Sequence, residues 1–128
     1  MGTWGIGPFD NDVALDWTHE LANEGPRFLI ASMARVSDAE ADAYLGVATC
    51  QEALAAVGTV LGLSDDLEVP DAVADWHRRH PELPDGLRAM AAEVLRRVLE
   101  ASELADLWLE EGDQGWRVAT ARLAQRLG

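Results

Sequence analysis

The feature that most constrains this chain is an apolar segment over residues 38–62. Between Asp42 and Asp65 the only charged residue is Glu52. The apolar residues of the segment recur at alternating steps of four and three: Ala43, Val47, Cys50, Leu54, Val57 and Leu61. That spacing is typical of a helix, and a helix that is apolar nearly all round belongs inside a bundle. We therefore expect residues 38–62 to form a buried central helix.

Start and stop signals predict further helices on both sides of this segment. Ser37-Asp38-Ala39-Glu40 has the spacing of a capping box and predicts the start of the central helix. The other predicted helices are 10–24 with Asp10 or Asn11 as its N-cap, 27–36, 70–80, one from Pro84, one from Ser102, and 116–127. No segment has the alternating pattern of a half-buried strand. The sequence thus predicts an all-α fold, a single domain over residues 1–128, built as a compact, irregular or orthogonal bundle of five to seven helices.

The opening stretch, MGTWGIGPFDND, holds three Gly, one Pro and two large aromatic residues before its acids. Gly5-Ile6-Gly7-Pro8 ahead of a helix has some likeness to a phosphate-binding loop. A dinucleotide fingerprint follows a strand, however, and acids at the helix start would repel phosphate. We interpret residues 1–9 as a loop that caps the bundle, with Trp4, Ile6 and Phe9 buried. Phe9 is expected to pack on the first helical turn as a hydrophobic staple.

Acidic residues follow at helical spacing. Asp12, Asp16 and Glu20 lie four residues apart and share one helix face. Stacked carboxylates could bind Ca²⁺ or Mg²⁺, but acids also favour the positive end of a helix dipole and face water. We expect the second arrangement, with no metal and no cofactor. The candidate surface for a partner or ligand comprises Trp4, Asp10, Asn11, Asp12, Asp16 and Glu20.

Other reactive residue types have ordinary structural explanations. His77 and His80 flank two arginines, and we interpret them as a basic last turn that complements a helix C-terminus. Cys50 is expected to be a small, inert, buried residue. Trp17, Trp76, Trp108 and Trp116 have apolar neighbours at helical spacing and are expected in the core. No nucleophile elbow or ordered Ser, His and Asp set is present.

Charge narrows the class of partner. The net charge is −13, and residues 1–75 carry 14 acids against two arginines. Nucleic-acid binding requires the opposite sign, so we expect no nucleic-acid partner. The acidic part suits a basic protein partner, or serves solubility alone.

Targeting and compartment follow from what the sequence lacks. No run approaches the roughly 20 apolar residues of a membrane span, and the N-terminus has no secretory signal. The lone Cys50 cannot form an intrachain disulfide, which fits a cytoplasmic protein. The sequence does not determine the oligomeric state.

Two classes of function stay open. The first is a non-enzymatic protein-binding module, such as an immunity-like or inhibitory protein that engages a basic partner. The second is an enzyme, or a protein that binds a small ligand or metal, with its site between the N-terminal loop and the first helix.

The segments GTWGIGPFDND and SELADLWLE, with Trp17 and Trp116, resemble a bacterial family, number 4259 among domains of unknown function. The resemblance runs from end to end. It implies that the opening motif and the tail tryptophan belong to the identity of the fold. The family carries no established reaction, substrate or cofactor, so the resemblance implies no catalytic residue.

Overall fold

The fold consists of helices packed around one central helix. The computed structural model describes residues 5–64, 67–112 and 114–127. Within these ranges there are seven helices and no strand: α1 (Asp12–Leu21), α2 (Pro26–Ser37), α3 (Val47–Ser64), α4 (Asp71–Arg79), α5 (Leu87–Glu100), α6 (Glu103–Glu110) and α7 (Gly115–Leu127). The predicted all-α fold is confirmed. None of the helices in these ranges is long and apolar enough to cross a membrane.

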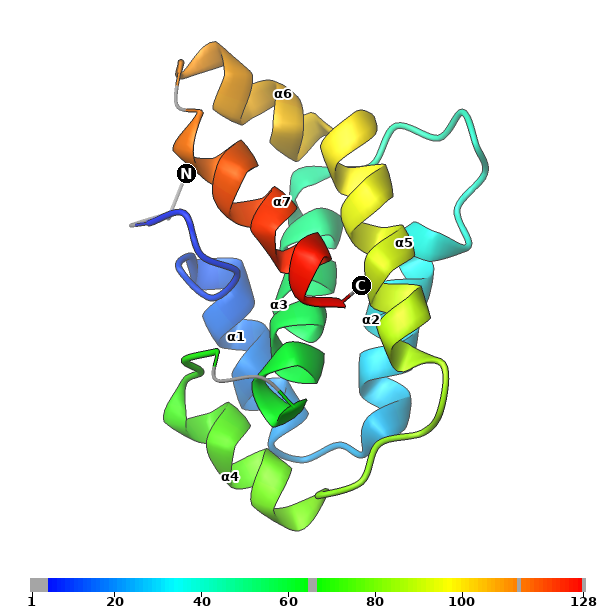
Figure 1. The fold of residues 1–128 in the computed structure, drawn as a ribbon, viewed down its shortest axis with the longest axis vertical. Coiled ribbons are helices and arrows are strands. Elements are labelled where there is room, and N and C mark those ends of the chain that lie inside the picture. The colour runs from blue at the N-terminus through cyan, green and yellow to red at the C-terminus, as the bar shows by residue number, and fades with distance from the viewer. Residues whose placement is uncertain (1–4, 65–66, 113, 128) are drawn as a thin grey trace.

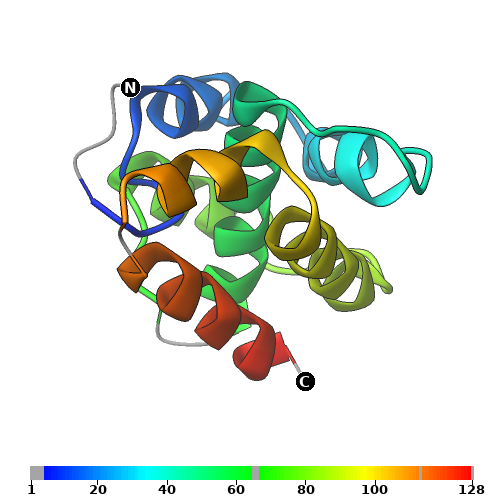
Figure 2. The same ribbon diagram turned by 90° about the horizontal axis from the view of Figure 1, so that it is seen from above.

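The central helix is α3, as the apolar segment predicts. It packs against α1, α2, α4, α5 and α6, and Figures 1 and 2 show it passing through the middle of the bundle. Helix α6 crosses one end of the bundle and α4 the other (Figure 1). The α3 residues Cys50, Ala53, Val57 and Leu61 are fully buried. Near-complete burial explains why this helix has almost no charged residue.

Helix α3 begins at Val47, later than the sequence predicts, and residues 38–46 lie outside any helix. The capping box does not form, because Ser37 is the last residue of α2. The Glu103 carboxylate, from α6, instead accepts a hydrogen bond from the Val47 backbone N–H at 3.2 Å. A side chain from a distant helix thus fixes the start of α3.

Arg97 of α5 holds the connection that precedes α3. Its guanidinium donates to the backbone carbonyls of Val36, Ala39 and Glu40. These carbonyls belong to the end of α2 and the following loop, where the regular helical hydrogen bonds stop. A cation at a helix C-terminus also complements the helix dipole. Arg97 therefore stabilises the non-helical path of residues 38–40.

Helix α4 covers the turn between α1 and α2. The Trp76 indole N–H donates to the Glu24 carbonyl at 2.7 Å, and Arg79 donates to the Ala22 carbonyl at 3.0 Å. Both bonds occupy backbone acceptors beyond the end of α1, which ends at Leu21 rather than near Glu24. All four tryptophans predicted in the core are buried: Trp17, Trp76, Trp108 and Trp116.

The last three helices form the remaining side of the bundle. Helix α5 begins at Leu87, after Gly86 with a φ of 88°, rather than at Pro84. Ser102 caps α6 by accepting a hydrogen bond from the Ala105 N–H at 3.0 Å, as the sequence predicts. The stacked rings of Trp108 and Trp116 join α6 to α7 across their short connection.

Candidate functional site

The N-terminal loop, residues 5–11, folds around the side chain of Asp10. The Asp10 carboxylate accepts a hydrogen bond from the Gly7 N–H at 3.0 Å, and the Asp10 N–H donates to the Gly7 carbonyl. A Cβ at Gly5 or Gly7 would lie 2.6 or 2.8 Å from Asp10 Oδ2. A side chain at either position would therefore force the Asp10 carboxylate to move from this position.

The N-cap of α1 is Asn11, not Asp10. Asn11 has extended backbone angles, and its side-chain oxygen accepts a hydrogen bond from the Ala14 N–H at 2.8 Å. Both residue types are good N-caps, so local sequence does not choose between them. Because Asn11 caps α1, the Asp10 carboxylate is left to accept the hydrogen bond from the Gly7 N–H within the loop.

The loop is anchored on the central helix through Pro8 and Phe9. Phe9 is buried, and a Cβ at Gly58 of α3 would lie 2.8 Å from Phe9 Cε2 and 3.1 Å from Pro8 Cγ. Phe9 thus packs into the space that Gly58 leaves open. The predicted burial of Phe9 is confirmed. Ile6, however, is 39% exposed, so its predicted burial is wrong, and Trp4 lies outside the described residues.

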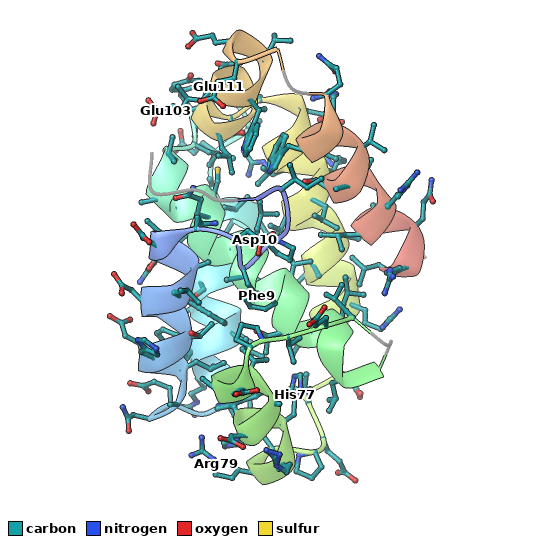
Figure 3. The ribbon with its side chains drawn as sticks, turned by 90° about the vertical axis from the view of Figure 1, so that its left-hand side faces the viewer. Phe9, Asp10, His77, Arg79, Glu103 and Glu111 are labelled. Carbon is teal, nitrogen blue, oxygen red and sulfur yellow. The ribbon has the colours of Figure 1, made fainter. Side chains whose placement is uncertain are left out.

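A cleft of about 470 Å³ lies beside Asp10, between the N-terminal loop, α1 and residues 67–70. Its lining residues are Gly7, Pro8, Phe9, Asp10, Leu15, Leu67, Glu68, Val69 and Pro70. We call it the Asp10 cleft. Its walls include the apolar side chains of Leu15, Leu67 and Val69, and its two ionisable lining side chains, Asp10 and Glu68, are both acidic. Figure 3 shows Asp10 near the centre of this face of the molecule.

Three other clefts differ from the Asp10 cleft in the charge of their linings. The cleft at Trp108 and Trp116, about 340 Å³, includes Arg117. A cleft of about 500 Å³ beside the start of α5 includes Arg88, and one of about 250 Å³ beside its end includes Arg96 and Arg97. An arginine thus accompanies the carboxylates in each of the three. Among the described residues that line the Asp10 cleft, the charged ones are Asp10 and Glu68, and both are acidic.

The predicted site residues separate into three groups. Asp10 lines the cleft and Asn11 is a buried cap, whereas Asp12, Asp16 and Glu20 are exposed on α1. Within the described ranges no three His, Cys, Asp or Glu side chains lie close enough to hold a metal ion. Asp10 and Glu68 line the same cleft, although the sequence pattern does not single out Glu68. The acidic character of residues 63–69 is visible in the sequence, but nothing there places them against the loop.

His77 lies in the basic last turn of α4, as predicted, together with Arg78 and Arg79, but its ring also packs into the core. The ring is buried beneath α3, and its Nε2 lies 2.7 Å from the Thr59 carbonyl oxygen, to which it donates. Burial lowers the pKa of His77, with partial compensation by this hydrogen bond. In Figure 3 the His77 side chain points from α4 toward α3, while Arg79 lies at the outer edge. The neutral imidazole is the form that this environment favours.

Two further groups with altered acidity lie on the α6 side of the molecule. Burial raises the pKa of the Cys50 thiol to about 11, so the thiol stays protonated at neutral pH. The Tyr44 hydroxyl donates to Asp106 at 2.7 Å, which raises the pKa of Tyr44 to about 12. Neither group lines the Asp10 cleft.

Comparison with known proteins agrees with the sequence resemblance. The sequence profile of a family described as "Domain of unknown function (DUF4259)" matches residues 2–119. The chain belongs to this family. No curated protein and no solved structure matches the chain. The N-terminal loop, the Asp10 cleft and the Trp108–Trp116 stack all lie within the matched residues, so each is part of the DUF4259 domain as this chain builds it.

Proposed function

We propose that this protein is a non-enzymatic module that binds a basic protein partner, in the manner of an immunity or inhibitory protein. The observation that carries the proposal is the negative surface around the N-terminal loop. Asp12, Asp16 and Glu20 are exposed on α1, next to the cleft that Asp10 and Glu68 line. A surface of one charge speeds encounter with a partner of the opposite charge and disfavours others.

The distribution of arginines supports the same conclusion. Arg78, Arg96 and Arg35 form ion pairs with Asp75, with Glu93 and Glu100, and with Glu52. Arg79, Arg97 and Arg117 donate to backbone carbonyls. Among the described residues, none of these arginines forms an ion pair with Asp12, Asp16 or Glu20. The negative field of this surface remains available to a partner.

The positions of the common catalytic groups favour binding over catalysis. The Cys50 thiol is buried and protonated, and the buried His77 ring is engaged with Thr59. The described lining of the Asp10 cleft includes carboxylates but no thiol, hydroxyl or imidazole that could act as a nucleophile. The proposal includes a cytoplasmic location, which the single free thiol supports.

The test measures how the partner's affinity depends on salt and on α1. The wild-type chain captures its partner from the native bacterial host, and the purified partner is then titrated at increasing ionic strength. We expect binding to weaken steeply with salt. The triple variant D12N/D16N/E20Q should weaken binding more than the control E82Q/E110Q/E111Q, which removes equal charge at other exposed sites. An acidic partner, or affinity that is unchanged in high salt, would overturn the proposal.

A further inference from the structure

We infer that the Asp10 cleft receives an arginine side chain of the basic partner, with Asp10 and Glu68 binding its guanidinium group. The inference rests on the proposed function and names the chemical group that the partner presents. It also assigns a different role to each part of the acidic surface. The exposed acids of α1 attract the partner, and the cleft holds one of its side chains.

The charge and the lining of the cleft together select a cationic group with an apolar stem. Both ionisable residues in the lining are acids, whereas the three other clefts pair acids with arginines. The remaining walls include the aliphatic side chains of Leu15, Leu67 and Val69. Arginine buries its methylene stem against apolar surface while its head group meets polar partners. The volume of about 470 Å³ lies within the range of sites that bind small molecules.

The same lining disfavours a metal ion. Ca²⁺ takes six to eight oxygen ligands, and Mg²⁺ needs near-octahedral oxygen coordination. The cleft offers two carboxylates among mostly apolar residues, and the described residues include no metal-binding group of three. A guanidinium group is less strongly hydrated than a metal ion or an ammonium group and can pair with a planar carboxylate through two hydrogen bonds. An arginine side chain therefore fits the cleft better than a lysine side chain or a metal ion.

Asp10 is held in position before any partner binds. The Gly7 N–H fixes its carboxylate, Asn11 anchors the chain at α1, and Phe9 packs against Gly58 of α3. A receptor group that is already ordered loses less conformational entropy on binding.

The experiment uses the full chain, labelled with ¹⁵N, and three capped tripeptides as probes. Acetyl-Gly-Arg-Gly-amide is compared with the lysine peptide and with the citrulline peptide, which has the shape of arginine without its charge. We expect the arginine peptide to shift the amide resonances of Gly7, Asp10, Glu68 and Val69. The lysine peptide should bind more weakly, and the citrulline peptide should leave these resonances unchanged.

Variants assign the binding to the cleft. D10N keeps a side-chain acceptor for the Gly7 N–H, and E68Q alters a residue exposed to solvent. Each should weaken the arginine peptide about fivefold, the size of a partly exposed ion pair. The matched control D12N/D16N removes two charges on α1 and should have a smaller effect. Denaturation curves establish that each variant folds.

The outcomes separate this inference from the proposed function. If a basic partner binds in a salt-dependent way but D10N and E68Q leave both partner and peptide affinity unchanged, the cleft is not the arginine site and the inference fails alone. Equal shifts with the citrulline peptide would also overturn it. If the peptide binds in the cleft but the native partner is acidic, the proposed function fails, whereas the assignment of the cleft as an arginine-binding site is retained.

Discussion

Phe9 of the N-terminal loop occupies the space above Gly58 of α3, where a Cβ would lie 2.8 Å from its ring. This contact fixes the loop on the most buried helix of the bundle. It links the N-terminal loop, which carries Asp10, to the apolar segment that determines the fold. The position of the Asp10 cleft therefore depends on the absence of a side chain at Gly58, in the middle of α3.

The Gly58→Ala substitution tests this relationship. The added methyl group would overpack the contact with Phe9, at a cost of about 1–3 kcal/mol, while the helix would gain about 1 kcal/mol in propensity. We expect a net loss in the free energy of unfolding, measured by urea denaturation. In a Phe9→Leu background the clash is relieved, so the same substitution should be neutral or stabilising. An equal effect in both backgrounds would show that Phe9 is not the cause.

Arg97 provides a second test, because its guanidinium binds three carbonyls. Arg97→Met keeps an apolar stem but leaves those acceptors without their charged donor. We expect the free energy of unfolding to fall by about 1.5–3 kcal/mol, the cost of losing hydrogen bonds to a charged group. Amide exchange in residues 38–42 should accelerate. Arg122→Met, at an exposed position of α7, is the control and should change stability by less than about 0.5 kcal/mol.

The start of α3 shows what the sequence could and could not predict. The apolar spacing from Val47 to Leu61 identified the central helix, because burial alone explains that pattern. Its start was misplaced because the capping box at Ser37 and Glu40 is a local signal. Contacts from Arg97 and Glu103, more than 50 residues away, override it.

The same limit applies to the candidate site. Asp10 stands out in the sequence because it follows the glycines that it contacts. Glu68 does not, because only the folded chain brings residues 67–70 against the N-terminal loop. Asn11 and Asp10 are equally good caps by residue type, so the sequence could not show which of them would line the cleft.

His77 predicts a dependence of stability on pH. Its pKa is lowered in the folded state from an ordinary value of 6.5, so below about pH 6.5 the unfolded chain binds more protons than the fold. Stability is therefore retained above pH 6.5 and falls as the pH decreases toward the folded-state pKa. His77→Gln should reduce the loss between pH 7 and pH 5, measured by denaturation at each pH. His19→Gln, at an exposed position, should retain the wild-type loss; an equal reduction in both variants would contradict the assignment.

Gln51 is a polar residue buried in the central helix. It lies on α3 and is 5% exposed, yet no hydrogen bond joins its side chain to any residue that the structure describes. It faces a gap of about 10 Å³ shared with Asn11, Leu54 and the Trp108–Trp116 pair. An unpartnered buried polar group costs about 1–3 kcal/mol.

Gln51→Met keeps a side chain of similar length and removes the amide. We therefore expect the free energy of unfolding to rise by about 1 kcal/mol, because half or more of that cost is recovered. Gln114→Met, at an exposed position, controls for the change in hydrophobicity and should be nearly neutral. A loss of stability in Gln51→Met would contradict this prediction, because it would show that a polar partner in the gap compensates the amide; a gap of this size accommodates about one water molecule.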